Sequence, residues 1–238
     1  MNKKIALCLS GYFDSLNDNT SKGLDGFNYL QKHILNKYDS DIFIHCWQPE
    51  LQDKILKLYN PQQYCFEKQI NFSELVKLNG LSHLVNQPRL PETVFSHFYS
   101  VQSSFKLLYS QEKKYDIVIK SRFDIGRINR NTSGPGKHNP FPVQCINFNP
   151  NLDMNFIYVA NWQYFNDGPP DMWFYSGYDN MKHFCNIFDK IKNNYLIINS
   201  DYYNSDINNV SNAIRLYKKF FQDVRILSKL KPLDTQWE

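Results

Sequence analysis

Charged side chains at every second position follow a short apolar run in the middle of the chain. Tyr115–Asp124 reads YDIVIKSRFD, and its Ile-Val-Ile core has the β-branched pattern of a buried strand. Lys120, Arg122 and Asp124 come next, and an extended backbone would place all three on one side of the sheet. Lysine and arginine bind phosphate groups, whereas aspartate can hold a divalent cation or accept a hydrogen bond from ribose. A structural salt-bridge cluster would give the same pattern, but the position at a strand end favours a functional role.

Two other predicted strands also end in polar residues. "KIALCLSG" ends at Ser10 and Gly11, and "SDIFIHCW" has His45 near its end. In an open parallel sheet, ligands bind at the carboxyl ends of the strands, where Gly11 would let the backbone approach a ligand closely. His45 could contact a ligand at the same edge, but a hydrogen-bonded structural role is the stronger alternative for it.

The chain also predicts the sheet and helices that such strand ends require. Apolar runs and helical periodicities alternate from the N-terminus as strand, helix, strand, helix, strand, the order that builds a parallel sheet. Strands are predicted at 4–11, 40–47, 63–68, 117–119 and 156–160, and helices at 24–38, 50–61, 72–78, 91–115, 178–192 and 206–221. A loop rich in Gly, Pro and Asn is predicted at 126–142. The expected fold class is α/β, a single domain over 1–238 with a mostly parallel central sheet flanked by helices.

Composition narrows the class of protein. The 238 residues, of which 42% are hydrophobic and 16% aromatic, are enough to bury a full core and argue against disorder. A net charge of +4 suits an anionic small ligand but lacks the clustered basic stripe of a nucleic-acid binder. No apolar run reaches membrane-spanning length, which leaves only peripheral membrane contact open. We therefore expect no nucleic-acid partner and no transmembrane segment.

The cysteines and the N-terminus indicate a reducing compartment. The five cysteines are scattered, and no pair has the close spacing of a zinc site, so we expect reduced thiols in the core. The N-terminal apolar run is short, is broken by Gly11 and has no cleavage site after it, which argues against a signal peptide. The expected location is the cytoplasm, either of a bacterium or, for a viral protein, of its host.

An ordered set of motifs gives the chain a family resemblance. "KIALCLSG", "DIFIHCW", "FYSVQSSFKLL", "YDIVIKSRFD" and "PDMWFYSG" follow one another along the sequence. In this order they resemble the small nucleotide-sugar-dependent glycosyltransferases of the GT-A class found in bacterial surface-polysaccharide loci and large-virus genomes. The resemblance implies a Rossmann-like GT-A domain, with a nucleotide-binding half at 1–125 and an acceptor-side half at 126–238. It also implies a nucleotide-diphosphate sugar as donor and a glycan or other hydroxyl compound as acceptor.

The resemblance also assigns residues to the donor site. It places Ser10, Gly11 and Tyr12 near the nucleotide, and Arg122 and Asp124 at the position of the GT-A DxD signature. The first carboxylate of that signature is replaced by arginine here, so a Mn²⁺ or Mg²⁺ ion would have Asp124 alone as its protein carboxylate.

Basic side chains offer a metal-free alternative to that ion. Relatives that lack the metal stabilise the departing nucleotide with cations, and four residues of this chain could do so. They are Lys120, Arg122, Arg127 and Lys137.

The implied reaction needs a base for the acceptor hydroxyl if the enzyme inverts the sugar configuration. Asp171, after a Gly-Pro-Pro turn, is the candidate base, and Asp167 is its substitute if Asp171 only caps a helix or turn. Trp173 and Tyr175 are the candidate acceptor-binding aromatics. Trp162 and Tyr164 could act in the same way, although packing in the core is the alternative for all four rings.

Other functions compete with glycosyl transfer. The nearest is a non-catalytic nucleotide- or carbohydrate-binding protein that keeps the fold after losing the metal carboxylate. The sequence has neither the GxxxxGK[ST] motif of a P-loop nor a GxGxxG motif after its first strand, which disfavours other phosphate-binding enzymes and dinucleotide oxidoreductases.

Overall fold

The computed structural model describes residues 3–14, 22–79, 91–129, 141–142, 144–161, 168–192 and 213–233. Within these ranges, seven strands form one sheet in the order β3-β2-β1-β4-β8-β7-β9, and β5 pairs separately with β6. The strands are β1 (Ile5–Gly11), β2 (Ser40–Cys46), β3 (Gln63–Phe66), β4 (Ile117–Arg122), β5 (Ile128–Asn129), β6 (Phe141–Pro142), β7 (Ile157–Ala160), β8 (Trp173–Ser176) and β9 (Leu230–Leu233). The helices are α1 (Lys22–Leu30), α2 (Gln52–Tyr59), α3 (Ser73–Leu78), α4 (Pro91–Tyr109), α5 (Tyr178–Met181), α6 (Ile187–Ile191) and α8 (Ala213–Asp223).

The sheet is mostly parallel, as the sequence predicted. Strands β3, β2, β1 and β4 run in one direction, and β7 and β9 share it. Strand β8 alone in this sheet runs against its neighbours, between β4 and β7. The α/β class with helices flanking the sheet is thereby confirmed.

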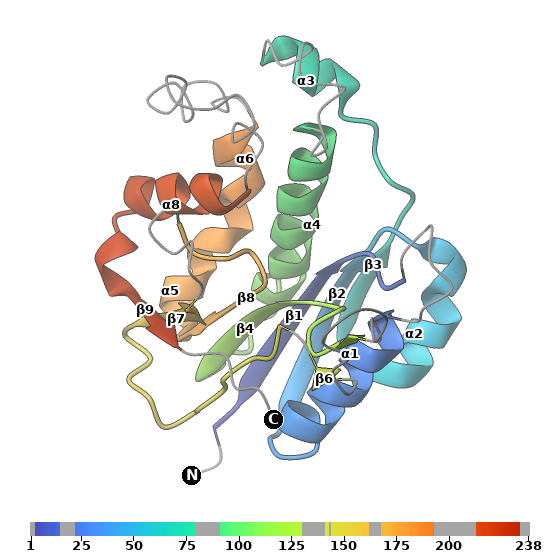
Figure 1. Cartoon of the computed structure of the whole chain (residues 1–238), viewed down its shortest axis with the longest axis vertical. Helices are drawn as coiled ribbons and strands as arrows, with labels where there is room; N and C mark the ends of the chain where they lie inside the picture. The colour runs from blue at the N-terminus through green and yellow to red at the C-terminus, as the bar shows by residue number, and fades with distance from the viewer. Residues whose placement is uncertain are drawn as a thin grey trace, which may run out of the picture.

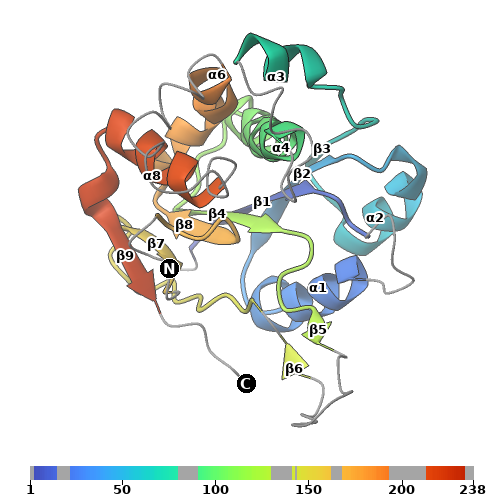
Figure 2. The same cartoon turned by 45° about the horizontal axis from the view of Figure 1, so that its top comes forward.

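Helices cover both faces of the sheet and build a separate core on each. Helix α4 lies on one face with α5, α6 and α8 beside it, whereas α1 and α2 lie on the other face (Figure 1, Figure 2). Alternation along β1 sends Ala6 and Cys8 toward the α4 face and Ile5, Leu7 and Leu9 toward the α1 face. All five side chains are fully buried, so β1 is the centre of the fold.

The chain changes direction across the sheet on either side of β1. From β1 it passes through α1 to β2 and through α2 to β3, moving outward along the sheet. Helix α4 then returns the chain to β4, which pairs with β1 on its other side. The carboxyl ends of β1 and β4 therefore form the topological switch point, the place where open α/β sheets bind ligands.

The second half of the chain differs most from the predicted elements. The segments Trp173–Ser176 and Leu230–Leu233 were assigned no element from the sequence, but they form β8 and β9. The helix predicted at 178–192 is present as α5, a 3₁₀ turn and α6. Short strands β5 and β6 pair within the predicted loop at 126–142, and residues 130–140 of that loop lie outside the described ranges.

Two further expectations can be compared with the fold. All five cysteines are free, with Cys8, Cys46 and Cys145 buried and Cys65 and Cys185 half-buried. In the part of the chain that the structure describes, no helix combines the length and the apolar character needed to cross a membrane.

Candidate functional site

Three residues predicted from separate strand ends lie in one row of the sheet. Ser10 of β1 is paired in register with Arg122 of β4 on one side and with His45 of β2 on the other. The row crosses the carboxyl edge at the switch point, so the expectation that these strand ends meet is confirmed.

Gly11 gives this edge an open backbone. Its φ of 105° lies in the region that favours glycine, and a Cβ added there would have no atom within 4 Å. Its N–H donates to Ser100 Oγ of α4 at 2.8 Å, which fixes the turn from below. Tyr12 follows, with its hydroxyl donating to Gln69 Oε1 at 2.6 Å. A ligand can therefore approach the main chain at Gly11 without displacing a side chain.

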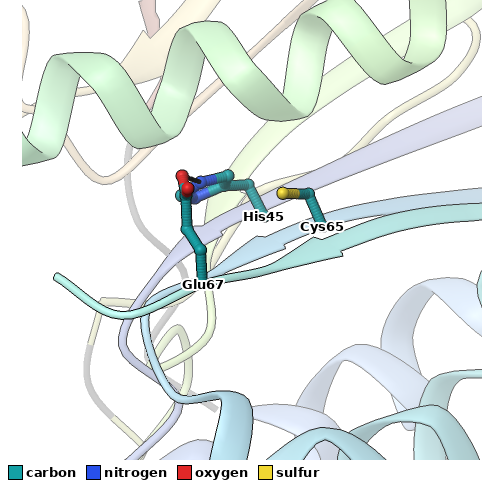
Figure 3. A group of neighbouring side chains, drawn as sticks. All are labelled: His45, Cys65 and Glu67. Carbon is teal, nitrogen blue, oxygen red and sulfur yellow. Dashed lines mark hydrogen bonds and ion pairs between the residues drawn. The ribbon is translucent and has the colours of Figure 1, made fainter. Parts of the chain in front are cut away.

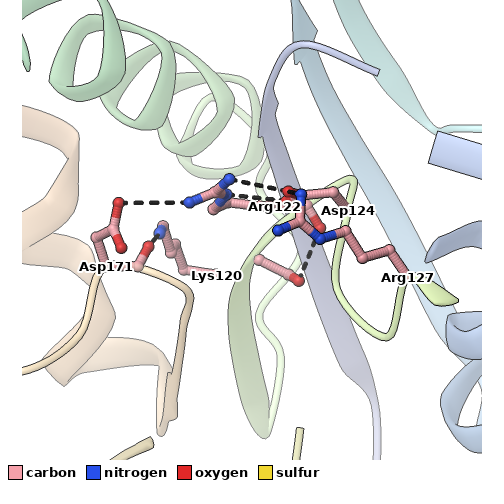
Figure 4. A network of polar contacts seen from close by, with 6 residues as sticks. Lys120, Arg122, Asp124, Arg127 and Asp171 are labelled. Carbon is pink, nitrogen blue, oxygen red and sulfur yellow. Dashed lines mark hydrogen bonds and ion pairs between the residues drawn. The ribbon is translucent and has the colours of Figure 1, made fainter. Parts of the chain in front are cut away.

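Arg122 and its neighbours form a charged cluster beside Gly11. We call Lys120, Arg122, Asp124, Arg127 and Asp171 the Arg122 cluster (Figure 4). Arg122 Nε and Nη2 donate to the two carboxylate oxygens of Asp124, each at 2.9 Å, and Arg127 Nη1 lies 3.5 Å from Asp124 Oδ2. On the other side, Arg122 Nη1 lies 3.6 Å from Asp171 Oδ2. Three basic and two acidic side chains leave this surface with a net positive charge when Lys120 is protonated.

Helix α1 holds the turn that carries Asp124. Gly26 of α1 lies directly against the backbone carbonyl of Phe123, and any Cβ at Gly26 would overlap that oxygen. Glycine at this position therefore permits the close approach of helix and turn. The turn places Asp124 where its carboxylate accepts hydrogen bonds from both Nε and Nη2 of Arg122.

The electrostatics of the cluster keep Asp171 and Arg122 ionised. Burial opposes ionisation of Asp171, but the positive charge of Arg122, helped by Lys120, holds the pKa of that carboxyl below its ordinary value. Burial likewise opposes the charge of Arg122, and the two carboxylates nevertheless raise the pKa of its guanidinium. The side chain of Arg122 is 34% exposed and that of Asp171 is 27% exposed, so solvent and a ligand reach both.

Lys120 supports this cluster from the core. It is fully buried, and its Nζ donates to the backbone carbonyl of Asp171. The ammonium lies 5.3 Å from the ring centroid of Phe174 and 5.6 Å from that of Tyr217. Burial is the main reason that the pKa of Lys120 falls to about 7, with Arg122 adding to the effect and Asp171 opposing it. Lys120 therefore positions the Asp171 segment, and its complete burial does not support the direct ligand contact that the sequence had suggested.

His97 and Tyr217 extend the cluster and were missed by the sequence analysis. His97 Nε2 lies 2.9 Å from Tyr217 Oη, although the two residues are 120 positions apart. Burial, reinforced by the charge of Lys120, lowers the pKa of His97 to about 3, so the imidazole is neutral. A polar side chain within the long helix at 91–109 was the one signal in the sequence, and its partner could not be inferred from it.

His45 belongs to a hydrogen-bonded chain, the alternative that the sequence left as the stronger one. We call Gly11, Ser100, His45 and Glu67 the His45 network. His45 Nδ1 lies 2.8 Å from Ser100 Oγ, and Nε2 lies 2.8 Å from Glu67 Oε1. Burial lowers the pKa of His45 although Glu67 opposes this, which favours the neutral ring. Because His45 is fully buried, it holds the Gly11 turn through Ser100 and is not exposed to a nucleotide at that edge.

The remaining predicted residues separate into two groups. Trp173 and Tyr175 are fully buried in β8, with Trp173 Nε1 donating to the Cys145 carbonyl and the Tyr175 hydroxyl to the Asn147 carbonyl. Both rings are core residues in this structure, so the acceptor-binding role predicted for them has no exposed surface to act through. The candidate residues Lys137, Trp162, Tyr164 and Asp167 lie outside the described ranges.

A separate cleft of about 500 Å³ borders the turn after Asp124. It is lined by Tyr29 of α1 and by Lys32 just after that helix, by Gly126 and Ile128, and by Phe148. It lies on the α1 face of the sheet, whereas Arg122 lies toward the α4 face with Lys120. The cleft is therefore distinct from the charged edge.

Comparison with known proteins assigns no family to this chain. A scan against protein-family models and a search of curated proteins find no match to this chain.

Proposed function

We propose that the chain is a glycosyltransferase that takes a sugar from a nucleotide-diphosphate donor, with the diphosphate bound over Gly11 and Arg122. The observation that carries this proposal is the pairing of Ser10 with Arg122 at the switch point, next to the open backbone of Gly11. This is the place in an open α/β sheet where phosphate-bearing ligands bind. A parallel half through β4, followed by a mixed half, also supports the two-part organisation that the motif resemblance implied.

Arg122 supplies the chemistry for the leaving diphosphate. A guanidinium binds phosphate oxygens with two parallel hydrogen bonds, and it keeps its charge throughout the pH range of interest. Arg122 already spans two carboxylates in the free protein, and a diphosphate would exchange with Asp171 for the Nη1 side of the fork. Arg127, at the same turn, adds a second cation that stabilises negative charge as the nucleotide departs.

Asp171 is the candidate base in this proposal. Its lowered pKa keeps it ionised at neutral pH, the state that a base needs. Displacement of Arg122 toward a diphosphate would remove the strongest stabilisation of that carboxylate and raise its proton affinity. Donor binding would in this way prepare Asp171 to accept the proton of an acceptor hydroxyl.

A divalent ion fits Asp124 poorly. Both carboxylate oxygens of Asp124 accept hydrogen bonds from Arg122, and Arg127 lies against one of them. Among the described residues, Asp124 belongs to no group of three or more potential metal ligands whose ligating atoms lie close together. We therefore derive no step through Mn²⁺ or Mg²⁺ at this site and assign charge stabilisation to the arginines.

A non-catalytic nucleotide- or carbohydrate-binding protein is the second candidate. It is favoured by the salt bridges that engage Asp124 and Asp171, because such pairs could simply stabilise the fold. This alternative predicts donor binding without turnover.

The test measures donor binding and turnover in the same samples. Thermal unfolding would be followed with UDP, GDP, TDP, CMP and their sugars, with and without Mn²⁺, and sugar release or transfer would be measured by chromatography. We expect one nucleotide class to raise the melting temperature independently of Mn²⁺. Arg122→Gln should abolish this increase, whereas Arg225→Gln, at an exposed position, should retain it.

Each result has a definite meaning. Binding with turnover supports the transferase, and binding without turnover, even with a panel of glycan acceptors, supports the second candidate. No increase with any nucleotide or nucleotide sugar would contradict the transferase and leave a carbohydrate-binding protein as the remaining candidate. Gly11→Val would test whether the donor binds over Gly11, since it places a branched side chain in the open space and strains a left-handed backbone.

A further inference from the structure

Three metal-binding side chains converge on the α4 face at the ends of β2 and β3. His45, Cys65 and Glu67 each offer one ligating atom, and these atoms lie within 4.8 Å of one another (Figure 3). His45 is paired in register with Cys65 across the two parallel strands. Glu67 lies two residues beyond Cys65, so the extended chain turns both side chains to the same face. The sheet itself therefore assembles the group, which spacing along the sequence did not reveal.

The donor types select one kind of ion. An imidazole nitrogen, a thiolate sulfur and a carboxylate oxygen together suit Zn²⁺, whereas Mg²⁺ and Ca²⁺ take oxygen ligands. In tetrahedral coordination with bonds of about 2.0 to 2.3 Å, ligating atoms lie roughly 3.3 to 3.6 Å apart. Because the ligating atoms lie within 4.8 Å of one another, movements of about 1 Å or less by each of two side chains would bring them to these separations. Cys65 and Glu67 are only half-buried, so their side chains have room for such movements.

The surroundings of His45 prepare its ring for a metal. Ser100 Oγ engages Nδ1 at 2.8 Å and leaves Nε2 directed at Glu67 Oε1, also at 2.8 Å. An ion bound between Nε2 and the carboxylate would replace the proton that now joins them. Metal-bound histidines commonly have their second nitrogen held in this way. The rings of Trp47 and Tyr99 lie 4.6 Å and 5.7 Å from the His45 ring and give the site an apolar wall.

We propose that His45, Cys65 and Glu67 bind a Zn²⁺ ion through three protein ligands, with the fourth coordination position open. The Glu67 side chain is 33% exposed, so solvent reaches this position and supplies water as the fourth ligand. On binding, the Cys65 thiol releases its proton to solvent as the sulfur–zinc bond forms. The imidazole proton then resides on Nδ1 and is donated to Ser100. The proposed metal binding does not require sugar transfer, and the site lies two strands from Arg122 along the same edge.

The test uses Co²⁺ as a spectroscopic substitute for zinc. The purified full chain would be freed of metal with a chelator and titrated with Co²⁺, and thiolate-to-metal charge transfer and tetrahedral d–d bands would be recorded. We expect saturation at one equivalent and loss of the bands when Zn²⁺ is added. Cys65→Ser should remove the charge-transfer band, whereas Cys185→Ser, which alters the other half-buried cysteine, should leave it unchanged.

A second variant covers the case in which Cys65→Ser fails to fold. Glu67→Gln removes the charge of a partly exposed ligand and should weaken Zn²⁺ affinity about 10- to 100-fold, as should Ser100→Ala through the orientation of His45. Circular dichroism would confirm folding of each variant. Absence of thiolate bands in the wild-type protein, or the same bands and affinity in both Cys65→Ser and Glu67→Gln, would overturn the proposal.

Discussion

The Arg122 cluster and the His45 network flank the same strand, yet different forces hold them. The cluster consists of charged side chains, and Arg122 and Asp171 are partly exposed. The network is a chain of hydrogen bonds that joins Gly11, Ser100 and Glu67 through a histidine that is fully buried. Ion pairs near solvent are weakened by salt and can exchange partners, whereas buried hydrogen bonds must stay satisfied. The comparison separates two tasks at one edge: the cluster offers charge to a ligand, and the network fixes the backbone that receives it.

Of the changes considered, removal of His45, the central residue of the buried network, should reduce the stability of the fold most. His45→Ala leaves a cavity beside Trp47 and deprives Ser100 and Glu67 of a partner. We expect a loss of about 3 kcal/mol in the free energy of unfolding, measured by urea denaturation. His183→Ala, at an exposed position, is the matched control and should change stability by less than about 0.5 kcal/mol. Equal losses in the two variants would contradict the role given to His45.

The pH dependence of Lys120 should give the next largest effect. Between its folded pKa of about 7 and its ordinary value of 10.5, the unfolded chain binds a proton that the folded chain does not. Stability therefore rises with pH in this window, by roughly 2 to 3 kcal/mol from pH 7 to 9. Lys120→Met removes this contribution. Denaturation curves of both proteins across this range should differ in slope, and parallel pH profiles would show that the buried amine keeps an ordinary pKa.

Removal of Arg122 should have a smaller effect on stability than removal of His45. Arg122→Ala breaks the paired bonds to Asp124 and the contact with Asp171. We expect a loss of about 2 kcal/mol, reduced from the value for a buried pair because a third of the side chain is exposed. The loss should shrink in 1 M NaCl, whereas that of His45→Ala should not. The same salt dependence in both variants would remove the distinction between the two regions.

Among the changes considered, removal of Arg127 should affect the free energy of unfolding least. Its guanidinium lies 3.5 Å from Asp124 and is 33% exposed, so Arg127→Ala should change the free energy of unfolding by about 0.5 kcal/mol or less. Its effect on donor binding should exceed its effect on stability, because a diphosphate carries more charge than the carboxylate it now faces. Isothermal titration with the preferred nucleotide would measure this, and unchanged affinity would place Arg127 outside the site.

Continuous apolar strands were the part of the fold that the sequence could predict. Strands β1, β2 and β4 are buried on both faces, so their residue types alone indicate strand and parallel pairing. Strand β8 is four residues of aromatic-rich sequence, too short to show a period. Strand β9 contains Pro232 and Lys231, which edge strands tolerate but which weaken any prediction from sequence.

The site was predictable to the extent that a general rule places polar residues at strand ends. That rule brought Ser10, Arg122 and His45 to one edge, where the register now aligns them. It could not pair His97 with Tyr217, because such contacts depend on how α4 and α8 pack over the sheet. The gathering of Cys65 and Glu67 around His45 was missed for a similar reason, since it follows from strand register.

Helix α4 contacts both regions through residues three positions apart. His97 reaches Tyr217 beside the Arg122 cluster, and Ser100 bridges Gly11 and His45. A rotation or shift of this one helix would therefore be felt at both ends of the row. If a ligand at either end displaces α4, the two binding equilibria are allosterically coupled. Thermodynamic reciprocity then requires that a metal at β2 and β3 change nucleotide affinity by the same factor by which the nucleotide changes affinity for the metal.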